Sequence, residues 1–198
     1  WYTAYQSWWK NRHNISLQKD SLIFTTGVIP AISTTVKRMT NTGDNIVIPT
    51  PVYDMFFHSV ENHGRHVLEC PLQCNDQEYT MDFEDLEKKL SDPLTTLMIL
   101  CNPHNPIGKV WTKEELQKIG SLCKKHHVVV LSDEIHCDLT LNQAEYVPFV
   151  AASAECAQNS ITCIAASKAF NLAGFQSAAV YIPNEGIRAV MDRGLNSD

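Results

Sequence analysis

Short apolar runs alternate with helical patterns along this chain of 198 residues, and this alternation limits the possible fold more than any other feature. The runs at 95–101 and 127–131 are almost entirely aliphatic, which is typical of strands that are buried on both faces. Between them, Thr112 and Glu115 have the spacing of a capping box at a helix start. Strand–helix–strand repetition predicts an α/β fold of three layers, in which a mostly parallel sheet lies between helices.

The remaining elements are expected to continue this alternation. Further strands are expected at 22–24, 45–48, 65–71, 160–165 and 178–182. Helices are expected at 1–14, 29–39, 53–62, 82–90, 112–125 and 184–193. We divide the chain into an N-terminal helical segment, residues 1–20, and one α/β domain, residues 21–198.

The composition argues against several classes of protein. A net charge of −6 is unsuited to a broad basic surface for nucleic acid. No apolar run reaches the roughly 18 residues that a membrane span needs, so neither a membrane nor nucleic acid is an expected partner. The seven cysteines lack the paired spacing of a structural zinc site, and we expect free thiols in a cytoplasmic protein.

Chemically useful residues follow the predicted strands, at the edge where open α/β sheets bind ligands. An anion site is expected at the helix start after Gly27, and the other groups are the aromatic Tyr53, the amide Asn105, the carboxylate Asp133 and the amine Lys168. Each residue alone also suits a turn, a helix cap, a core position or a solvated loop. Together they match pyridoxal phosphate, because a lysine binds its aldehyde and a carboxylate keeps its ring nitrogen protonated.

These motifs resemble those of the fold-type I pyridoxal phosphate enzymes, the aspartate aminotransferase superfamily. Residues 102–108 read Asn-Pro-His-Asn-Pro-Ile-Gly and are similar to the superfamily's Asn-Pro-x-Asn-Pro-Thr-Gly signature. The spacing of Asn105, Asp133 and Lys168 also suits the superfamily. The finer features resemble the branch of MalY/PatB-type cystathionine β-lyases, and they lie in segments 50–56, 108–112, 132–138 and 167–176.

The resemblance implies a role for each candidate residue. Lys168 would bind the cofactor covalently and remove the proton from the substrate α-carbon. Asp133 would pair with the ring nitrogen, and Asn105 would contact the phenolic oxygen. The remaining cofactor contacts would be Tyr53 on the ring face, Val28, Ile29 and Ser167 at the phosphate, and His136 near the phenolic oxygen, where many aminotransferases have a tyrosine.

The chain also departs from the superfamily pattern. Gln176 and Ala165 stand where many members have an arginine and a serine, and both changes reduce contacts to the phosphate. The chain begins with Trp1 and is considerably shorter than family members, which have a C-terminal small domain that binds the substrate carboxylate. We therefore expect residues 21–198 to be the large domain of a longer enzyme, without its small domain. By resemblance, the full-length enzyme is expected to be a homodimer.

The implied activity is that of a carbon–sulfur β-lyase, which releases thiol, pyruvate and ammonia from cystathionine or S-substituted cysteines. A pyridoxal phosphate aminotransferase stays open as an alternative, because both reactions begin with removal of the α-proton. A regulatory or inactive fragment is a second alternative. A weaker one is a metal site, for which the possible ligands are Asp133, Glu134, His136 and Asp138.

Overall fold

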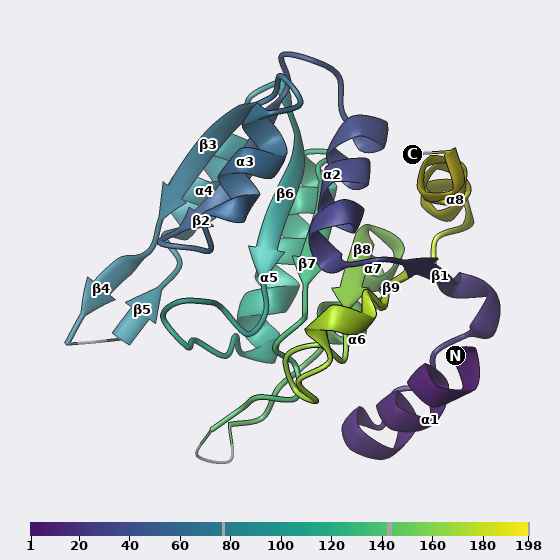
Figure 1. The fold of residues 1–198 in the computed structure, drawn as a ribbon. Coiled ribbons are helices and arrows are strands. Elements are labelled where there is room, and N and C mark those ends of the chain that lie inside the picture. The colour runs from purple at the N-terminus through teal and green to yellow at the C-terminus, as the bar shows by residue number, and fades with distance from the viewer. Residues whose placement is uncertain (77, 142–143, 198) are drawn as a thin grey trace.

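The computed structural model describes residues 1–76, 78–141 and 144–197. A seven-stranded sheet in the order β1-β9-β8-β7-β6-β2-β3 lies between layers of helices (Figure 1). Its strands are β1 (Leu22–Thr25), β2 (Asn45–Thr50), β3 (His66–Pro71), β6 (Thr95–Cys101), β7 (Val129–Asp133), β8 (Ser160–Ile164) and β9 (Ala178–Tyr181). The predicted three-layer fold with a mostly parallel sheet is confirmed.

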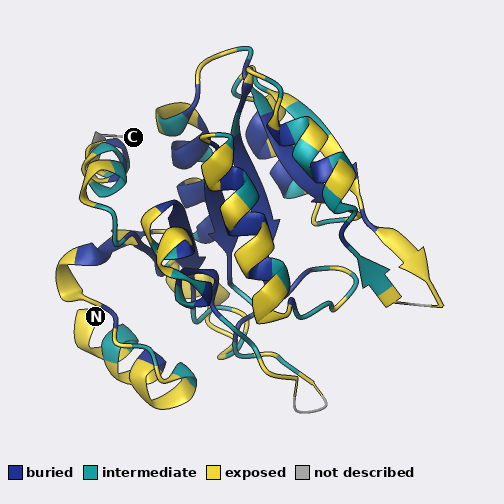
Figure 2. Cartoon of the chain, turned by 180° about the vertical axis from the view of Figure 1, so that it is seen from behind, coloured by how far each residue is buried: buried dark blue, intermediate teal, exposed yellow. Residues whose placement is uncertain are grey.

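Helices cover both faces of the sheet. One apolar core joins the sheet to α2 (Val28–Met39), α3 (Met55–Glu61) and α8 (Glu185–Ser197). A second core joins the opposite face to α4 (Phe83–Leu90), α5 (Lys113–Lys125), α6 (Phe149–Ala152) and α7 (Ala154–Gln158). Ile99 of β6 belongs to the first core and Met98 to the second, because successive side chains of a strand point to opposite faces. Figure 2 shows the result, a buried sheet whose covering helices are exposed on their outer sides.

Strand β9 runs antiparallel to both of its neighbours, β1 and β8, whereas the other neighbouring strands pair in parallel. Residues 165–177, which join β8 to β9, form only the short 3₁₀ helix η2 (Ala173–Phe175). A parallel return is usually made through an α-helix that packs on the sheet, and this connection contains none, so the chain comes back antiparallel to β8. The loop contains Lys168.

Most expected elements are present with shifted ends. The capping box is confirmed, since Thr112 Oγ1 accepts a bond from the Glu115 amide and the Glu115 carboxylate accepts one from the Thr112 amide. The strand expected at 127–131 lies at Val129–Asp133 instead. Sequence patterns did not indicate the hairpin of β4 (Gln73–Asn75) and β5 (Glu78–Thr80), nor α6 and α7, because these elements are too short to show a period.

The N-terminal segment forms α1 (Tyr2–His13), followed by the 3₁₀ helix η1 (Lys19–Ser21). Trp9 of α1 is buried in a small apolar cluster with Leu22 of β1 and Tyr181 of β9, so this helix packs at the β1 edge of the sheet. No helix in the described part of the chain is both long enough and apolar enough to cross a bilayer.

Gly120 of α5 gives a stability prediction in which two effects have opposite signs. Replacement of a helical glycine by alanine favours the helix by about 1 kcal/mol. A methyl group at Gly120, however, would collide with Sγ of the buried Cys156 and contact Phe149. Overpacking costs about 1–3 kcal/mol, so we expect Gly120→Ala to lower the free energy of unfolding measured in urea. Ser121→Ala, an exposed position of the same helix, is the control, and a rise for Gly120→Ala would contradict tight α5–α7 packing.

Candidate active site

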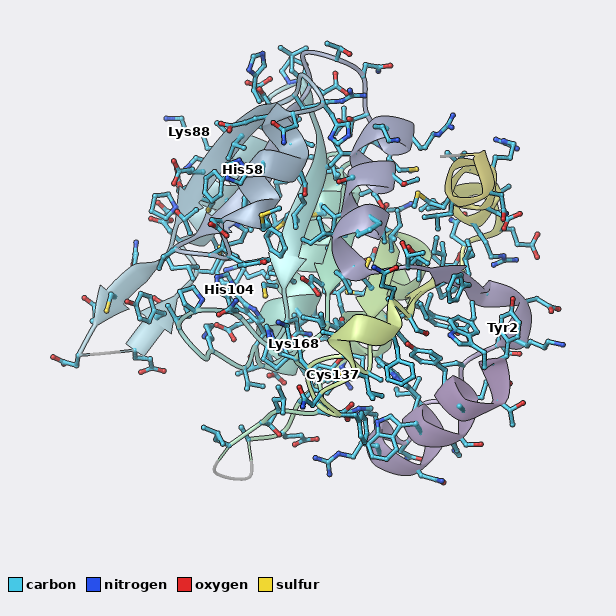
Figure 3. The ribbon with its side chains drawn as sticks, in the orientation of Figure 1. Tyr2, His58, Lys88, His104, Cys137 and Lys168 are labelled. Atoms are coloured by element: carbon cyan, nitrogen blue, oxygen red, sulfur yellow. The ribbon has the colours of Figure 1, made fainter. Side chains whose placement is uncertain are left out.

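A cavity of about 270 Å³ lies at the carboxyl ends of the parallel strands. Separate segments meet there because the ends of parallel strands share one edge of the sheet. Figure 3 shows Lys168 beyond the arrowhead of β6, at this edge. Every candidate residue from the sequence lines the cavity, namely Val28, Ile29, Tyr53, Asn105, Asp133, His136, Ser167 and Lys168.

One wall of the cavity is the N-terminus of α2. The first intrahelical bond of this region runs from the Ala31 amide to the Gly27 carbonyl. The amides of Val28 and Ile29 therefore have no acceptor within the helix, and Pro30 at the next position has no N–H. Two backbone donors and the positive end of the helix dipole face the cavity edge, and this combination suits an anion such as a phosphate.

Asp133 forms the floor of the cavity at the end of β7. Its neighbours in the sheet register are Cys101 of β6 and Cys163 of β8, and the residue is only 4% exposed. Burial raises the pKa of Asp133 to about 7, although a 3.0 Å hydrogen bond from the Ile135 amide and the charge of Lys168 act in the opposite direction. The ionised form of such a buried carboxyl group would be stabilised by a cationic hydrogen-bond donor. A protonated pyridine nitrogen is such a donor, so this carboxylate fits pyridoxal phosphate.

The mouth of the cavity carries the more accessible groups. Lys168 is exposed, and Tyr53 is 41% exposed with its ring centroid 6.0 Å from that of Phe56. Asn105 is half-buried, and its backbone amide donates to Sγ of Cys101 at 3.4 Å. Burial lowers the pKa of His136, and the charge of Lys168 lowers it further, so the imidazole is neutral at pH 7.

Some residues of the cavity were not indicated by the sequence patterns. They include Thr26, Cys101, Ile135 and Ser177. Cys101 was within reach of prediction, because the last residues of two adjacent parallel strands lie side by side and Asp133 ends the neighbouring strand. Gln176, already noted as a replacement for arginine, also lines the cavity.

The four residues of the metal hypothesis point in different directions. Asp133 and His136 face the cavity, whereas Glu134 is buried elsewhere and accepts bonds from Tyr146, Ser132 Oγ and the Phe149 amide. Burial raises the pKa of Glu134 to about 7 despite these donors. Within the described residues, the group with metal-ligand spacing is His13, Cys137 and Asp138.

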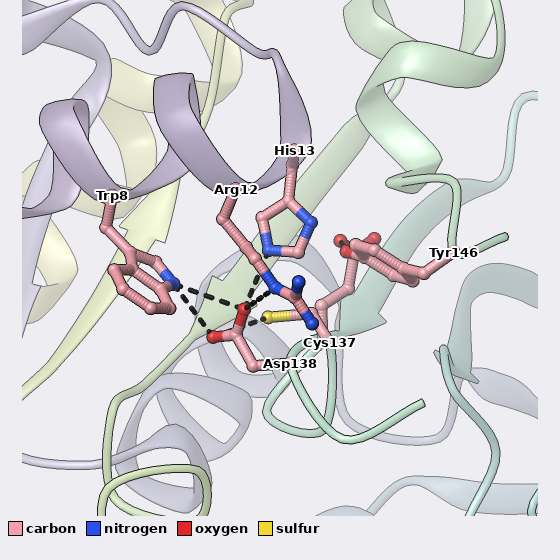
Figure 4. A network of polar contacts seen from close by, with 7 residues as sticks. Trp8, Arg12, His13, Cys137, Asp138 and Tyr146 are labelled. Carbon is pink, nitrogen blue, oxygen red and sulfur yellow. Dashed lines mark hydrogen bonds and ion pairs between the residues drawn. The ribbon is translucent and has the colours of Figure 1, made fainter. Parts of the chain in front are cut away.

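Asp138 instead connects the segment after β7 to α1, as Figure 4 shows. Its carboxylate accepts a bond of 3.0 Å from Trp8 Nε1 and lies 3.0 Å from His13 Nε2, with Arg12 Nε at 3.7 Å. Burial raises the pKa of Asp138, but the bonds from His13 and Trp8 outweigh burial and lower it. The network therefore holds α1 against the segment that carries His136.

The chain is similar to several known proteins. The family described as aminotransferase class I and II matches residues 2–196. Among curated proteins, the chain is similar to cystathionine beta-lyase PatB of Bacillus subtilis, with 48% identity over 95% of this chain and 49% of PatB. It is also similar to protein MalY of Escherichia coli, with 31% identity over 93% of this chain and 47% of MalY. The predicted resemblance to this branch is confirmed.

A solved structure gives the same result. The fold matches cystalysin from Treponema denticola, which contains a pyridoxal 5'-phosphate cofactor, with a TM-score of 0.95 and 39% identity. The match covers 98% of this chain and 49% of cystalysin. The chain thus spans about half the length of the relatives that it matches.

Asp133 predicts a pH-dependent stability of the cofactor-free protein. Its pKa is about 7 in the folded protein and near the ordinary 3.8 in the unfolded chain, so between these values the folded state binds more protons. The free energy of unfolding therefore falls as pH rises from about 4 to about 7. We expect Asp133→Asn to be more stable than wild type at pH 8, by up to about 4 kcal/mol, with the difference vanishing near pH 4.

Glu134 titrates in the same range, but both proteins retain it, so the difference between their urea unfolding curves isolates Asp133. Equal stabilities at pH 8 would show that the Asp133 carboxylate carries no burial penalty.

Proposed function

The chain belongs to the class I and II aminotransferase family, and on this premise we propose that it is the cofactor-binding part of a pyridoxal-phosphate-dependent carbon–sulfur β-lyase. The proposed substrates are cystathionine and S-substituted cysteines, and the proposed products are a thiol, pyruvate and ammonia. The observation that carries the proposal is the cavity in which Asp133, Lys168 and the α2 N-terminus meet. The similarity to PatB supports the lyase reaction in particular.

The cavity residues fit the cofactor from one end to the other. The Val28 and Ile29 amides and Ser167 would hold the phosphate, and Tyr53 would cover one face of the ring. Asn105 and His136 would contact the phenolic oxygen. Asp133 would keep the ring nitrogen protonated, and the gain of a cationic partner would return its raised pKa toward the ordinary range. When bound, pyridoxal phosphate supplies an electron sink for negative charge at the substrate α-carbon.

Lys168 is the proposed catalytic base. Its amine would bind the aldehyde of the cofactor, and once a substrate amine had replaced it, Nζ would be free to remove the α-proton. The thiolate would then leave from the β-carbon. Hydrolysis of the remaining three-carbon fragment would yield pyruvate and ammonia. Lys168 lies in the connection between β8 and β9, where it is exposed and lines the cavity.

Transamination is the second candidate, and the name of the family favours it. It uses the same α-proton removal by Lys168, but it transfers the amino group to a keto acid and breaks no carbon–sulfur bond. The need for a keto acid therefore separates the two reactions.

The other properties of the whole enzyme are also proposals. We propose that residues 1–20 lead into a large domain formed by 21–198, and that the rest of the enzyme supplies the arginine for the substrate carboxylate. A cytoplasmic location is supported by the cysteines, of which all seven are free and six are buried.

The central prediction concerns the full-length enzyme with saturating pyridoxal phosphate. We expect it to release thiol and pyruvate from cystathionine with no keto acid present, because elimination needs no amino acceptor. A thiol reagent and a coupled pyruvate assay measure the two products. A strict requirement for a keto acid would identify an aminotransferase instead.

The controls are two lysine variants. Lys168→Ala should abolish turnover and the visible absorbance band of the bound cofactor, whereas Lys118→Ala, at an exposed position of α5 outside the cavity lining, should change neither. Absence of a visible band in the wild-type enzyme at saturating cofactor would support a regulatory or inactive protein.

We further propose that the full-length enzyme is a homodimer. Exposed aromatic side chains support this proposal, since Trp8 and Phe170 meet edge to face at 4.9 Å on the surface and Phe175 is 78% exposed. Such a surface is suited to burial against a second copy. We expect light scattering to give twice the mass of one full-length chain, and a monomer at micromolar concentration would contradict this proposal.

A further inference from the structure

His104 is a buried residue of the 102–108 loop to which neither the sequence motif nor the proposed reaction gives a role. It is 1% exposed and follows β6 at the end of the sheet where the cofactor cavity lies. Figure 3 shows His104 and Lys168 at this same end. A buried histidine beside a candidate site has to satisfy its polar atoms within the protein, so its partners indicate what it holds.

The backbone of His104 closes the loop that carries Asn105. The His104 amide donates to the Lys109 carbonyl at 2.8 Å, and the Gly108 amide donates to the His104 carbonyl at 2.8 Å. Gly108 has a φ of +69°, which a glycine adopts without strain. Asn105, the next residue, is therefore held by a closed turn whose first residue is His104.

The side chain of His104 reaches a different loop, the one after β2. Its Nε2 atom lies 2.8 Å from the carbonyl oxygen of Pro51, which is two residues before Tyr53. A carbonyl only accepts, so Nε2 carries the proton and donates this bond. The other nitrogen, Nδ1, is buried, and within the described residues no group meets the geometry of a hydrogen bond to it. The ring also packs edge to face on Trp111, with centroids 5.8 Å apart.

We infer that His104 is a positioning residue that holds Asn105 and Tyr53 at a fixed separation across the cofactor. This inference rests on the proposed pyridoxal phosphate site. The strands β6 and β2 are neighbours in the sheet, and each ends in a loop that carries one cofactor contact. One side chain ties the two loops together, so its loss is expected to loosen both contacts at once. His104 itself does not line the cofactor cavity.

Two amide variants of the full-length enzyme distinguish loss of the hydrogen bond to Pro51 from loss of the volume of the His104 side chain. The amide nitrogen of glutamine lies where Nε2 of histidine lies, so His104→Gln keeps a donor for Pro51. The amide nitrogen of asparagine lies near the Nδ1 position, so His104→Asn leaves the Pro51 carbonyl without its donor. His58→Asn, the same change at an exposed position of α3, is the control.

The first readout is the dissociation constant for pyridoxal phosphate. We expect His104→Asn to raise it about tenfold, and His104→Gln and His58→Asn to leave it within about twofold. The pKa read from the visible band of the bound cofactor should also change in His104→Asn, because Asn105 is the proposed contact to the phenolic oxygen. If His104→Asn does not fold, His104→Met takes its place, since it fills the space but has no donor.

A second readout separates positioning from general stability. In the background of Tyr53→Ala and Asn105→Ala, His104→Asn should weaken cofactor binding less than about twofold, because the contacts it positions are already gone. An undiminished tenfold loss in that background would overturn the inference, as would equal binding by His104→Asn and wild type. Failure of the wild-type enzyme to bind cofactor would instead overturn the proposed function together with this inference.

Discussion

Burial of the Asp133 carboxylate between two strand ends is the constraint on which the site depends. The sheet is covered on both faces, so its strands are largely apolar, and the polar groups of the site lie at or just after the strand ends. Asp133 ends β7 between β6 and β8, where solvent is excluded and its pKa is raised to about 7. An ionised group in that place needs a cationic partner, and the cavity above it has room for one.

The rest of the site is arranged around that floor. The α2 N-terminus offers amide donors at one side of the cavity, and the loops after β2 and β6 supply Tyr53 and Asn105 at its mouth. Bonds outside the cavity hold these parts in place. His104 connects two of the loops, and Asp138 connects the segment after β7 to α1. A site whose parts are held in place before binding loses less conformational entropy when it binds a ligand.

Much of this arrangement could be predicted from the sequence because parallel sheets impose a simple rule. Strand 95–101 was located at its observed ends, since an aliphatic run with turn residues after it has few other interpretations. The direction of β9 was not predictable from its residues, because it depends on the connection before it, which contains no α-helix. The contact of His104 could not be predicted either. Its partner is the backbone carbonyl of Pro51, which is distant in the sequence, and such a bond produces no sequence pattern.

The most direct test of the account is to find the amine that holds the cofactor. The full-length enzyme is incubated with pyridoxal phosphate, reduced with borohydride, digested and analysed by mass spectrometry. The account predicts one phosphopyridoxyl adduct, on the peptide that contains Lys168, and no adduct on that peptide when an unreactive analogue lacking the aldehyde replaces the cofactor. An adduct confined to another lysine, or no adduct at all, would contradict it.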